Sequence, residues 1–308
     1  MISRKNSVAV IFSTYNQPAC LDLCLHALSL QGLAGFEVVV ADDGSTSETR
    51  DVIARYTDQP RFKLHHVWQQ DKGFRKTRIL NKAILATQAD YLVFTDGDCI
   101  LAPDFIDRHL EYARPGYYLA GSIIRLSRSL SAKITRDAIR DARAFDTGWL
   151  VRNGRSFNRR YLRLYLNRRA LEWLDRNTTT PPHWMGSNSS CFREDALAVN
   201  GFDHRFSYGF EDADFGIRLM NLGCRGKNVR WNAHALHLFH ERPYIKAGMR
   251  QQNRKLVAQP EDGGKFRVDD GLAELRHSGS VSLKRNPLVP TLSGIPSHGP
   301  CSPPTPER

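Results

Sequence analysis

Short apolar runs alternate with segments of helical periodicity through the first hundred residues of this 308-residue chain. Apolar runs at residues 8–12, 36–41 and 91–94 predict strands, the last extending to residue 96, and residues 62–68 could form another strand. Between them, apolar side chains recur every three or four positions, which predicts helices at residues 18–30, 47–56 and 75–87. This alternation predicts an α/β fold in which a mostly parallel sheet is covered by helices on both faces.

Polar side chains gather where these predicted strands end, at residues 14–16, 42–45, 71–75 and 96–98. Ligands of parallel sheets bind beyond the carboxyl ends of the strands, so one cleft is expected to collect these segments. No Gly-x-Gly-x-x-Gly follows the first strand, and the chain has no Gly-x-x-x-x-Gly-Lys-Ser/Thr. The pattern therefore supports neither a dinucleotide-binding fold nor a P-loop.

The fourth apolar run ends in Asp96-Gly97-Asp98. Alternate residues of an extended chain point the same way, so both carboxylates can face one cation while Gly97 lets a phosphate approach the backbone. Oxygen ligands of this kind suit Mg²⁺ or Mn²⁺ bridged to a diphosphate. The alternative is a strand-to-turn junction with two solvated aspartates.

The net charge of +12 is concentrated in one region. Residues 121–182 carry 14 of the 44 Arg and Lys residues but only five of the 32 Asp and Glu residues. Within this region, residues 157–174 place apolar side chains at helical intervals among arginines, which is typical of an amphipathic helix on a membrane surface. Two alternatives stay open: an ordinary helix with a solvated basic face, and a contact with nucleic acid.

Several function classes are disfavoured by the rest of the composition. The apolar runs are shorter than the roughly 20 residues of a membrane-spanning helix, and the run after Lys5 breaks too early for a secretory signal. The six cysteines form no Cys-x-x-Cys pair, so we expect reduced thiols, no structural zinc and a cytoplasmic location.

Residues 259–308 turn polar and rich in Ser, Pro and Gly, which predicts a disordered tail.

The second half of the chain offers three further groups of polar side chains. In the segment 183–190, Trp184 could stack on a sugar ring, and Gly186 and Asn188 are candidate sugar-binding residues; the alternative is a Gly-Ser turn beside a buried Trp. Glu211 and Asp212 begin a predicted helix that stops at Gly223.

A carboxylate at this helix start could act as a general base, or it could simply interact favourably with the helix dipole. Farther along the chain, His234, His237 and His240 could complete a metal shell, although a single histidine is usually structural.

Taken in order, these motifs resemble family 2 glycosyltransferases with the GT-A fold. The resemblance is closest to bacterial enzymes whose C-terminal part is similar to the galactosyltransferase module of β-1,4-galactosyltransferases and chondroitin polymerases. It spans residues 7–245 and depends on Asp42-Asp43-Gly44-Ser45, the Asp-x-Asp motif at residues 96–98, and residues 209–214, which look like the family's Gly-Trp-Gly-x-Glu-Asp-x-Asp. Tyr208 and Phe210 depart from that signature, where the family has Trp and Gly.

The resemblance implies a single GT-A domain with a mostly parallel mixed sheet flanked by helices. Residues 1–120 would form the nucleotide-sugar-binding half, residues 121–182 a basic helical insert, and residues 183–258 the acceptor and catalytic half. It implies that the UDP-sugar donor meets Thr14, Asp42, Asp43, Arg78 and Asp96.

The family's metal, Mn²⁺ or Mg²⁺, would be held by Asp98, with Asp96 reaching ribose or metal and with His237 or its rival His240 as a further ligand. Asp212 would be the base and Glu211 would orient the acceptor. The implied activity is an inverting transfer to a hydroxyl of a glycan or lipid-linked acceptor in envelope polysaccharide or lipopolysaccharide synthesis, without a nucleic acid partner. An anionic membrane surface is a candidate partner, which would hold the enzyme at the inner face of the cytoplasmic membrane. Two alternatives are a nucleotidyltransferase and a non-catalytic basic protein that binds nucleic acid or membrane.

Overall fold

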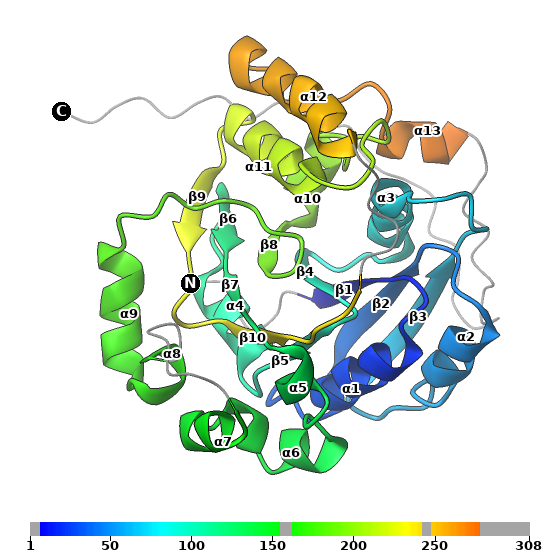
Figure 1. Cartoon of the computed structure of the whole chain (residues 1–308). Helices are drawn as coiled ribbons and strands as arrows, with labels where there is room; N and C mark the ends of the chain where they lie inside the picture. Colours follow the sequence, from blue (N-terminus) through cyan, green and yellow to red (C-terminus); the bar gives the residue numbers. More distant parts are fainter. Residues whose placement is uncertain (1–6, 155–161, 242–247, 278–308) are drawn as a thin grey trace.

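The computed structural model describes residues 7–154, 162–241 and 248–277. Its centre is a seven-stranded sheet with the order β3-β2-β1-β4-β8-β6-β9 (Figure 1). The strands are β1 (Val8–Thr14), β2 (Phe36–Asp42), β3 (Phe62–Trp68), β4 (Tyr91–Asp96), β6 (Tyr117–Ala120), β8 (Ser189–Phe192) and β9 (Arg225–Asn228). All neighbours are parallel except β8, which runs antiparallel to β4 and β6. The predicted mixed, mostly parallel sheet is therefore confirmed.

Helices cover both faces of this sheet because alternate residues of the central strands face opposite sides. Val10 and Phe12 of β1 lie in one core with α1 (Pro18–Ser29) and α2 (Ser47–Ala54). The intervening Ala9 and Ile11 lie in the other core with α3 (Lys76–Ala86), α10 (Arg193–Ala198) and α11 (Glu211–Asn221). The helices predicted at residues 18–30, 47–56 and 75–87 are all present, with ends within a few residues of their predicted positions.

A second, three-stranded sheet joins segments that are far apart in sequence. It has the order β5 (Cys99–Leu101), β10 (His234–His237) and β7 (Ser122–Arg125), and α4 (Phe105–Tyr112) follows β5. The basic insert was predicted to begin at residue 121, but β7 pairs with β10 and is part of this sheet. The helical part of the insert therefore begins after β7.

Short helices form the rest of the insert: α5 (Arg128–Ser131), α6 (Arg136–Arg140), the 3-10 helix η1 (Arg143–Phe145), α7 (Thr147–Arg152), α8 (Leu162–Tyr165) and α9 (Arg168–Asn177). The amphipathic helix predicted over residues 157–174 is not continuous: residues 157–161 lie outside the described residues, and the remainder is divided between α8 and α9. The division falls at Asn167, whose side chain accepts a hydrogen bond from the Ala170 backbone and caps α9. No helix in the described ranges combines the length and apolarity needed to span a bilayer.

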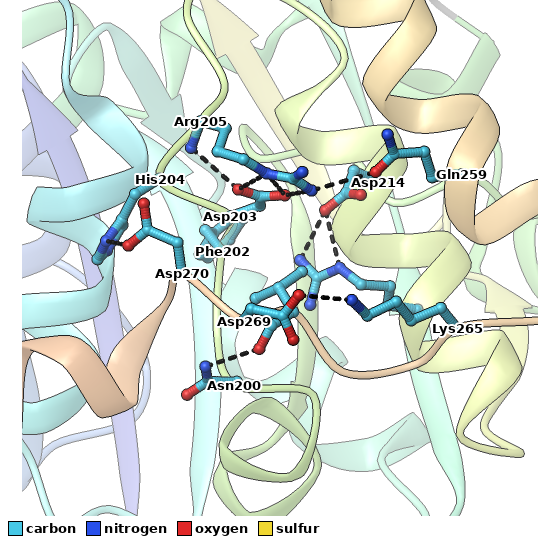
Figure 2. A network of polar contacts seen from close by, with 12 residues as sticks. Asn200, Phe202, Asp203, His204, Arg205, Asp214, Gln259, Lys265, Asp269 and Asp270 are labelled. Carbon is cyan, nitrogen blue, oxygen red and sulfur yellow. Dashed lines mark hydrogen bonds and ion pairs between the residues drawn. The ribbon is translucent and has the colours of Figure 1, made fainter.

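The prediction of a disordered tail from residue 259 is wrong for residues 259–277. Helix α12 (Met249–Gly263) packs on α11, and α13 (Leu272–His277) packs on α3. Leu272 and Leu275 are buried, so this segment packs on the rest of the protein although it has few apolar residues. Figure 2 shows the polar contacts that fasten the segment, among them His204 with Asp270 and Arg205 with Gln259. Residues 278–308 lie outside the described residues.

Asn200 anchors this C-terminal segment, and we expect Asn200→Ala to lower the free energy of unfolding by about 2–3 kcal/mol. The buried amide donates to the Val268 carbonyl at 2.9 Å and accepts from the Ala273 backbone at 2.8 Å. Its φ of 63° also lies in the left-handed region, which asparagine tolerates better than alanine. Urea denaturation would measure the loss. Asn177→Ala, at an exposed helix end, is the control, and an equal loss in both variants would contradict the role of Asn200.

Candidate active site

A cavity of about 470 Å³ lies beyond the carboxyl ends of β1 and β4. Eight residues predicted for the site line it: Thr14, Asp43, Asp96, Asp98, Glu211, Asp212, His237 and His240. The volume is in the range of small-molecule sites. The cleft expected from the strand ends is therefore present, and it collects acidic side chains that are more than a hundred positions apart in the sequence.

Asp98, His237 and His240 form a cluster that could hold a divalent metal. Their potential ligand atoms all lie within 4.8 Å of one another. Nε2 of His240 is 2.8 Å from Oδ2 of Asp98, and Nε2 of His237 is 3.5 Å from the same oxygen. The second sheet creates this arrangement, because His237 pairs with Cys99 in register and the Leu238 backbone donates to the Asp98 carbonyl. Both histidines, rather than one of the two rivals, belong to the cluster.

The environment of Asp98 favours its charged form. Burial raises the pKa of Asp98, but the hydrogen bond from His240 and the charges of both histidines outweigh this effect and hold the pKa below its usual value. One carboxylate and two imidazoles are a donor set that fits a divalent transition-metal ion. Gln17 lies 2.8 Å from Nδ1 of His240, so the ring is oriented by a second contact.

Asp96 is not a member of this cluster. Its Oδ1 accepts a hydrogen bond from Ser13 Oγ at 2.6 Å and pairs with Lys76 Nζ at 2.8 Å. Asp96 faces the cavity, but its partners in this structure are a hydroxyl and an ammonium group. Gly97 packs closely on β1, because a Cβ there would be 3.1 Å from both Ser13 O and Thr14.

On the side of the cavity formed by β1 and β2, Thr14 and Asp43 face the space. Thr14 Oγ1 is buried and has no hydrogen-bond partner among the described residues. Asp43 accepts from the Gln69 side chain at 2.6 Å and from the Arg75 backbone at 2.8 Å, while burial raises its pKa. The two residues leave an unsatisfied hydroxyl and a positioned carboxylate for a polar ligand.

Asp42 and Arg78, predicted for the same role, do not line the cavity. The buried Asp42 carboxylate accepts from the Ser45 backbone and pairs with His66, so it fixes the loop after β2. Arg78 is two residues after Lys76 on α3, and a two-residue step turns a helical side chain to a different face. The predicted contact of these two residues with a ligand in the cavity therefore has no support in this geometry.

Asp212 lies in the first turn of α11 and is the best-placed candidate base. Oδ2 accepts a hydrogen bond from the Gly186 backbone at 2.9 Å, while the buried Oδ1 has no partner among the described residues. Burial raises the pKa of Asp212, with the charge of Lys76 acting in the opposite direction. Gly186 is required here because an added Cβ would lie 2.6 Å from Oδ1 of Asp212.

The turn before α11 is held in an unusual backbone conformation. Gly209 and Phe210 have φ angles of 98° and 70°, and the Gly209 backbone donates to Glu211 at 2.7 Å. Asn253 of α12 donates to the carbonyls of residues 207, 208 and 209, which fixes the turn from behind. A left-handed Phe costs backbone energy and is typical of functional sites. Burial and the neighbouring Asp212 raise the pKa of Glu211.

Lys76 is a site residue that the sequence analysis missed. Its ammonium group pairs with Asp96 and interacts electrostatically with Asp212 and Glu211. Burial lowers the pKa of Lys76, but the three carboxylates raise it well above its ordinary value. Its position at the start of a helix that follows a polar strand end is the sequence feature that could have indicated a role of Lys76 in the site.

Two of the predicted sugar-binding residues are in the protein interior. Trp184 is 5% exposed and packs edge-to-face on Phe94 and Phe215, so the alternative of a buried Trp is correct. Asn188 is fully buried and donates to the backbone carbonyls of Ser122 and Ala233. Neither side chain lines the cavity.

From the same loop, Met185 and Ser187 line the cavity instead. On the wall beside α11 the lining includes Phe74, Tyr208, Phe210 and Arg250. Tyr208 and Phe210, the two positions that depart from the family signature, therefore contribute to the wall beside the candidate base.

Two family models match adjoining parts of this chain. The model of glycosyl transferase family 2 matches residues 9–178, and that of the N-terminal domain of galactosyltransferase matches residues 178–241. The validoxylamine A glucosyltransferase of Streptomyces hygroscopicus subsp. jinggangensis is 31% identical over 69% of this chain and 51% of its own length. The chondroitin synthase of Pasteurella multocida is 23% identical over 72% of this chain and 24% of its own length. The chain thus spans about half the length of the first relative.

Two solved structures share the fold at low sequence identity. Staphylococcus aureus TarS 1-349 in complex with UDP-GlcNAc has a TM-score of 0.57 and 16% identity, covering 87% of this chain and 69% of that chain. The mannosyltransferase PcManGT from Pyrobaculum calidifontis, in complex with GDP-Man and Mn²⁺, has a TM-score of 0.55 and 18% identity, covering 79% and 59%. The fold is GT-A, as predicted. With a family model that matches more than half of its residues, this chain belongs to glycosyltransferase family 2.

Proposed function

We propose that this protein is a metal-dependent, inverting glycosyltransferase that moves a sugar from a UDP-sugar to a hydroxyl of a glycan or lipid-linked acceptor. One observation carries the proposal. Three side chains that could hold a divalent metal ion line the same cavity as a buried carboxylate, one oxygen of which has no hydrogen-bond partner among the described residues. These are the two chemical functions that such a transfer needs, one at the leaving group and one at the attacking hydroxyl.

Asp98, His237 and His240 would hold the metal. When bound, a divalent ion would neutralise the charge that develops on the diphosphate leaving group. The two imidazole donors favour Mn²⁺ over Mg²⁺, because Mg²⁺ prefers oxygen ligands and retains several waters. The complex of the mannosyltransferase PcManGT with GDP-Man and Mn²⁺ supports this choice.

Asp212 would remove the proton of the acceptor hydroxyl, and its free Oδ1 is the oxygen that would receive it. Glu211, one residue earlier, would orient the acceptor while it fixes the Gly209 turn. Inversion follows if the base and the leaving group lie on opposite sides of the anomeric carbon. Thr14 and Asp43 would bind the nucleoside of the donor.

The choice of UDP as nucleotide is supported by the UDP-GlcNAc complex of TarS, and a glycan acceptor by the chondroitin synthase relative. We propose a role in envelope polysaccharide or lipopolysaccharide synthesis. The five described cysteines are free thiols, which supports a cytoplasmic site of action.

The direct test measures the nucleoside diphosphate, UDP or GDP, that is released from a panel of UDP-sugars and GDP-mannose, with Mn²⁺, with Mg²⁺ and with EDTA. We expect slow metal-dependent UDP release without an acceptor and faster release with one. Pyrophosphate released from UTP and a sugar 1-phosphate, with no UDP released from any UDP-sugar, would indicate a nucleotidyltransferase instead. No turnover with any donor, together with no Mn²⁺ binding, would contradict the proposal.

Lys76→Met is expected to move the acid limb of the pH profile of kcat to higher pH. The lysine charge lowers the pKa of Asp212, so its removal raises that pKa, and a general base is active only when deprotonated. The activity loss should therefore be larger at pH 6 than at pH 9. Lys82→Met, on the same helix but outside the cavity lining, is the control. A loss independent of pH would contradict this role.

A further inference from the structure

The basic insert carries the two most exposed large apolar side chains among the described residues. Tyr165 at the end of α8 is 79% exposed, and Trp173 in α9 is 62% exposed. The opposite side of α9 is anchored, since Leu171 is buried and Asp175 accepts hydrogen bonds from the backbone of Trp231 and Asn232. These contacts fix the orientation of α9, so the side chains on its opposite side face the solvent.

Two arginines share the outer side of α9 with Trp173. Arg169, Trp173 and Arg176 follow one another at steps of four and three residues, which places them on one side of the helix, and all three are exposed. Neither arginine forms an ion pair with a described residue. Arg168, by contrast, is paired with both Glu111 and Glu172. The outer side thus combines an exposed indole with two positive charges that no adjacent carboxylate neutralises by contact.

Further positive charge adjoins this surface. Lys227 lies on β9, the edge strand of the large sheet, with its ammonium group 4.5 Å from the centre of the Tyr112 ring. Burial, followed by the charges of Arg114 and Arg176, lowers the pKa of Lys227, while the charges of Asp175 and Glu111 act in the opposite direction. We define the α9 face as the exposed side chains of Arg169, Trp173 and Arg176.

We propose that the α9 face docks on an anionic membrane surface, with the phosphate groups of acidic lipids as the ligands of its cations. Indole and phenol rings favour the headgroup region, where their apolar body and polar tip are both accommodated. Guanidinium groups bind phosphate in a bidentate geometry, and each well-placed cation strengthens the attraction to an anionic leaflet. The contact would be peripheral and salt-sensitive.

The geometry favours a lipid surface over single-stranded nucleic acid. Proteins that hold single strands combine stacking rings with a basic groove. Neither Tyr165 nor Trp173 lines the active-site cavity or the cavity of about 280 Å³ beside α8 and α9. The rings stand on an outward helical surface, which suits a flat partner. The docking does not depend on the proposed reaction, although it would bring the enzyme to any lipid-linked acceptor.

Flotation of the full chain with vesicles tests this inference. We expect binding to vesicles of phosphatidylcholine with 30 mol% phosphatidylglycerol, little binding to phosphatidylcholine alone, and release at high salt. Arg169→Gln should weaken the partition coefficient about fivefold, and Arg169→Gln with Arg176→Gln about 25-fold. Trp173→Ser should weaken it about tenfold.

Matched controls lie on the far side of the molecule, where α2 and β3 are found (Figure 1). Arg50→Gln with Arg55→Gln removes two positive charges from α2 and its C-terminal cap, and Trp68→Ser removes a Trp that is 51% exposed. These variants should float like the wild type. Equal weakening of vesicle binding in test and control variants would overturn the inference, because binding would then depend on the net charge of the protein and not on the α9 face. Failure to float with anionic vesicles, or tight salt-dependent RNA binding lost in the arginine variant, would overturn it as well.

Discussion

Asp212→Asn is expected to lower kcat by about 10²–10⁴-fold while leaving the affinity for the donor nearly unchanged. The amide can still accept the hydrogen bond from the Gly186 backbone, so the loop contact at 2.9 Å is retained. What disappears is the ability of the free oxygen to take a proton. Steady-state kinetics with saturating donor and acceptor, together with donor titration by calorimetry, would separate the two effects.

Two variants sharpen this test. Asp195→Asn makes the same chemical change on α10, outside the cavity lining, and should alter kcat by less than about twofold. Glu211→Gln keeps an acceptor for the Gly209 backbone and should cost less than Asp212→Asn. If Glu211→Gln abolished transfer while Asp212→Asn retained most of it, the base would be Glu211 and the assignment of Asp212 would be wrong.

Asp98→Asn is expected to weaken Mn²⁺ binding by more than about 100-fold and to remove metal-stimulated transfer. Asp98 would supply the charged ligand of the proposed metal site, and the contact of 2.8 Å to His240 fixes its orientation. Calorimetric titration of the full chain with Mn²⁺ alone reports this loss without any measurement of turnover. Treatment of the wild type with EDTA should abolish activity, and added Mn²⁺ should restore it.

The histidines provide the internal check on this site. His237→Ala and His240→Ala should each weaken Mn²⁺ binding, and the double variant should be less than additive because both act on one ion. His66→Ala, which changes the partner of Asp42 outside the cavity lining, should bind Mn²⁺ like the wild type. Stronger loss in Asp96→Asn than in Asp98→Asn would show that the metal site is centred elsewhere.

Long-range partners are the part of this structure that the sequence could not predict. Asp96 and Asp98 alternate along an extended chain, yet Lys76 and Ser13 occupy one carboxylate while the second sheet delivers two histidines to the other. Trp184 is a residue type that often stacks on sugars, but here its ring packs against Phe94 and Phe215 in the protein interior. Residues 259–277 look too polar to fold alone. They are ordered because they form hydrogen bonds with earlier parts of the chain, for example with the side chain of Asn200.

The sequence by itself determined the alternation of strands and helices, the strand ends at which the acidic side chains gather, and the family resemblance of the three acidic motifs. These features depend on local periodicity and on residues that are neighbours in the chain. Tertiary structure alone decided which side chains share the cavity, which carboxylate joins the histidines, and which oxygen of Asp212 stays free. The physical reason is that side-chain partners across sheets and helices compete for the same polar atoms, and only the folded chain fixes the outcome.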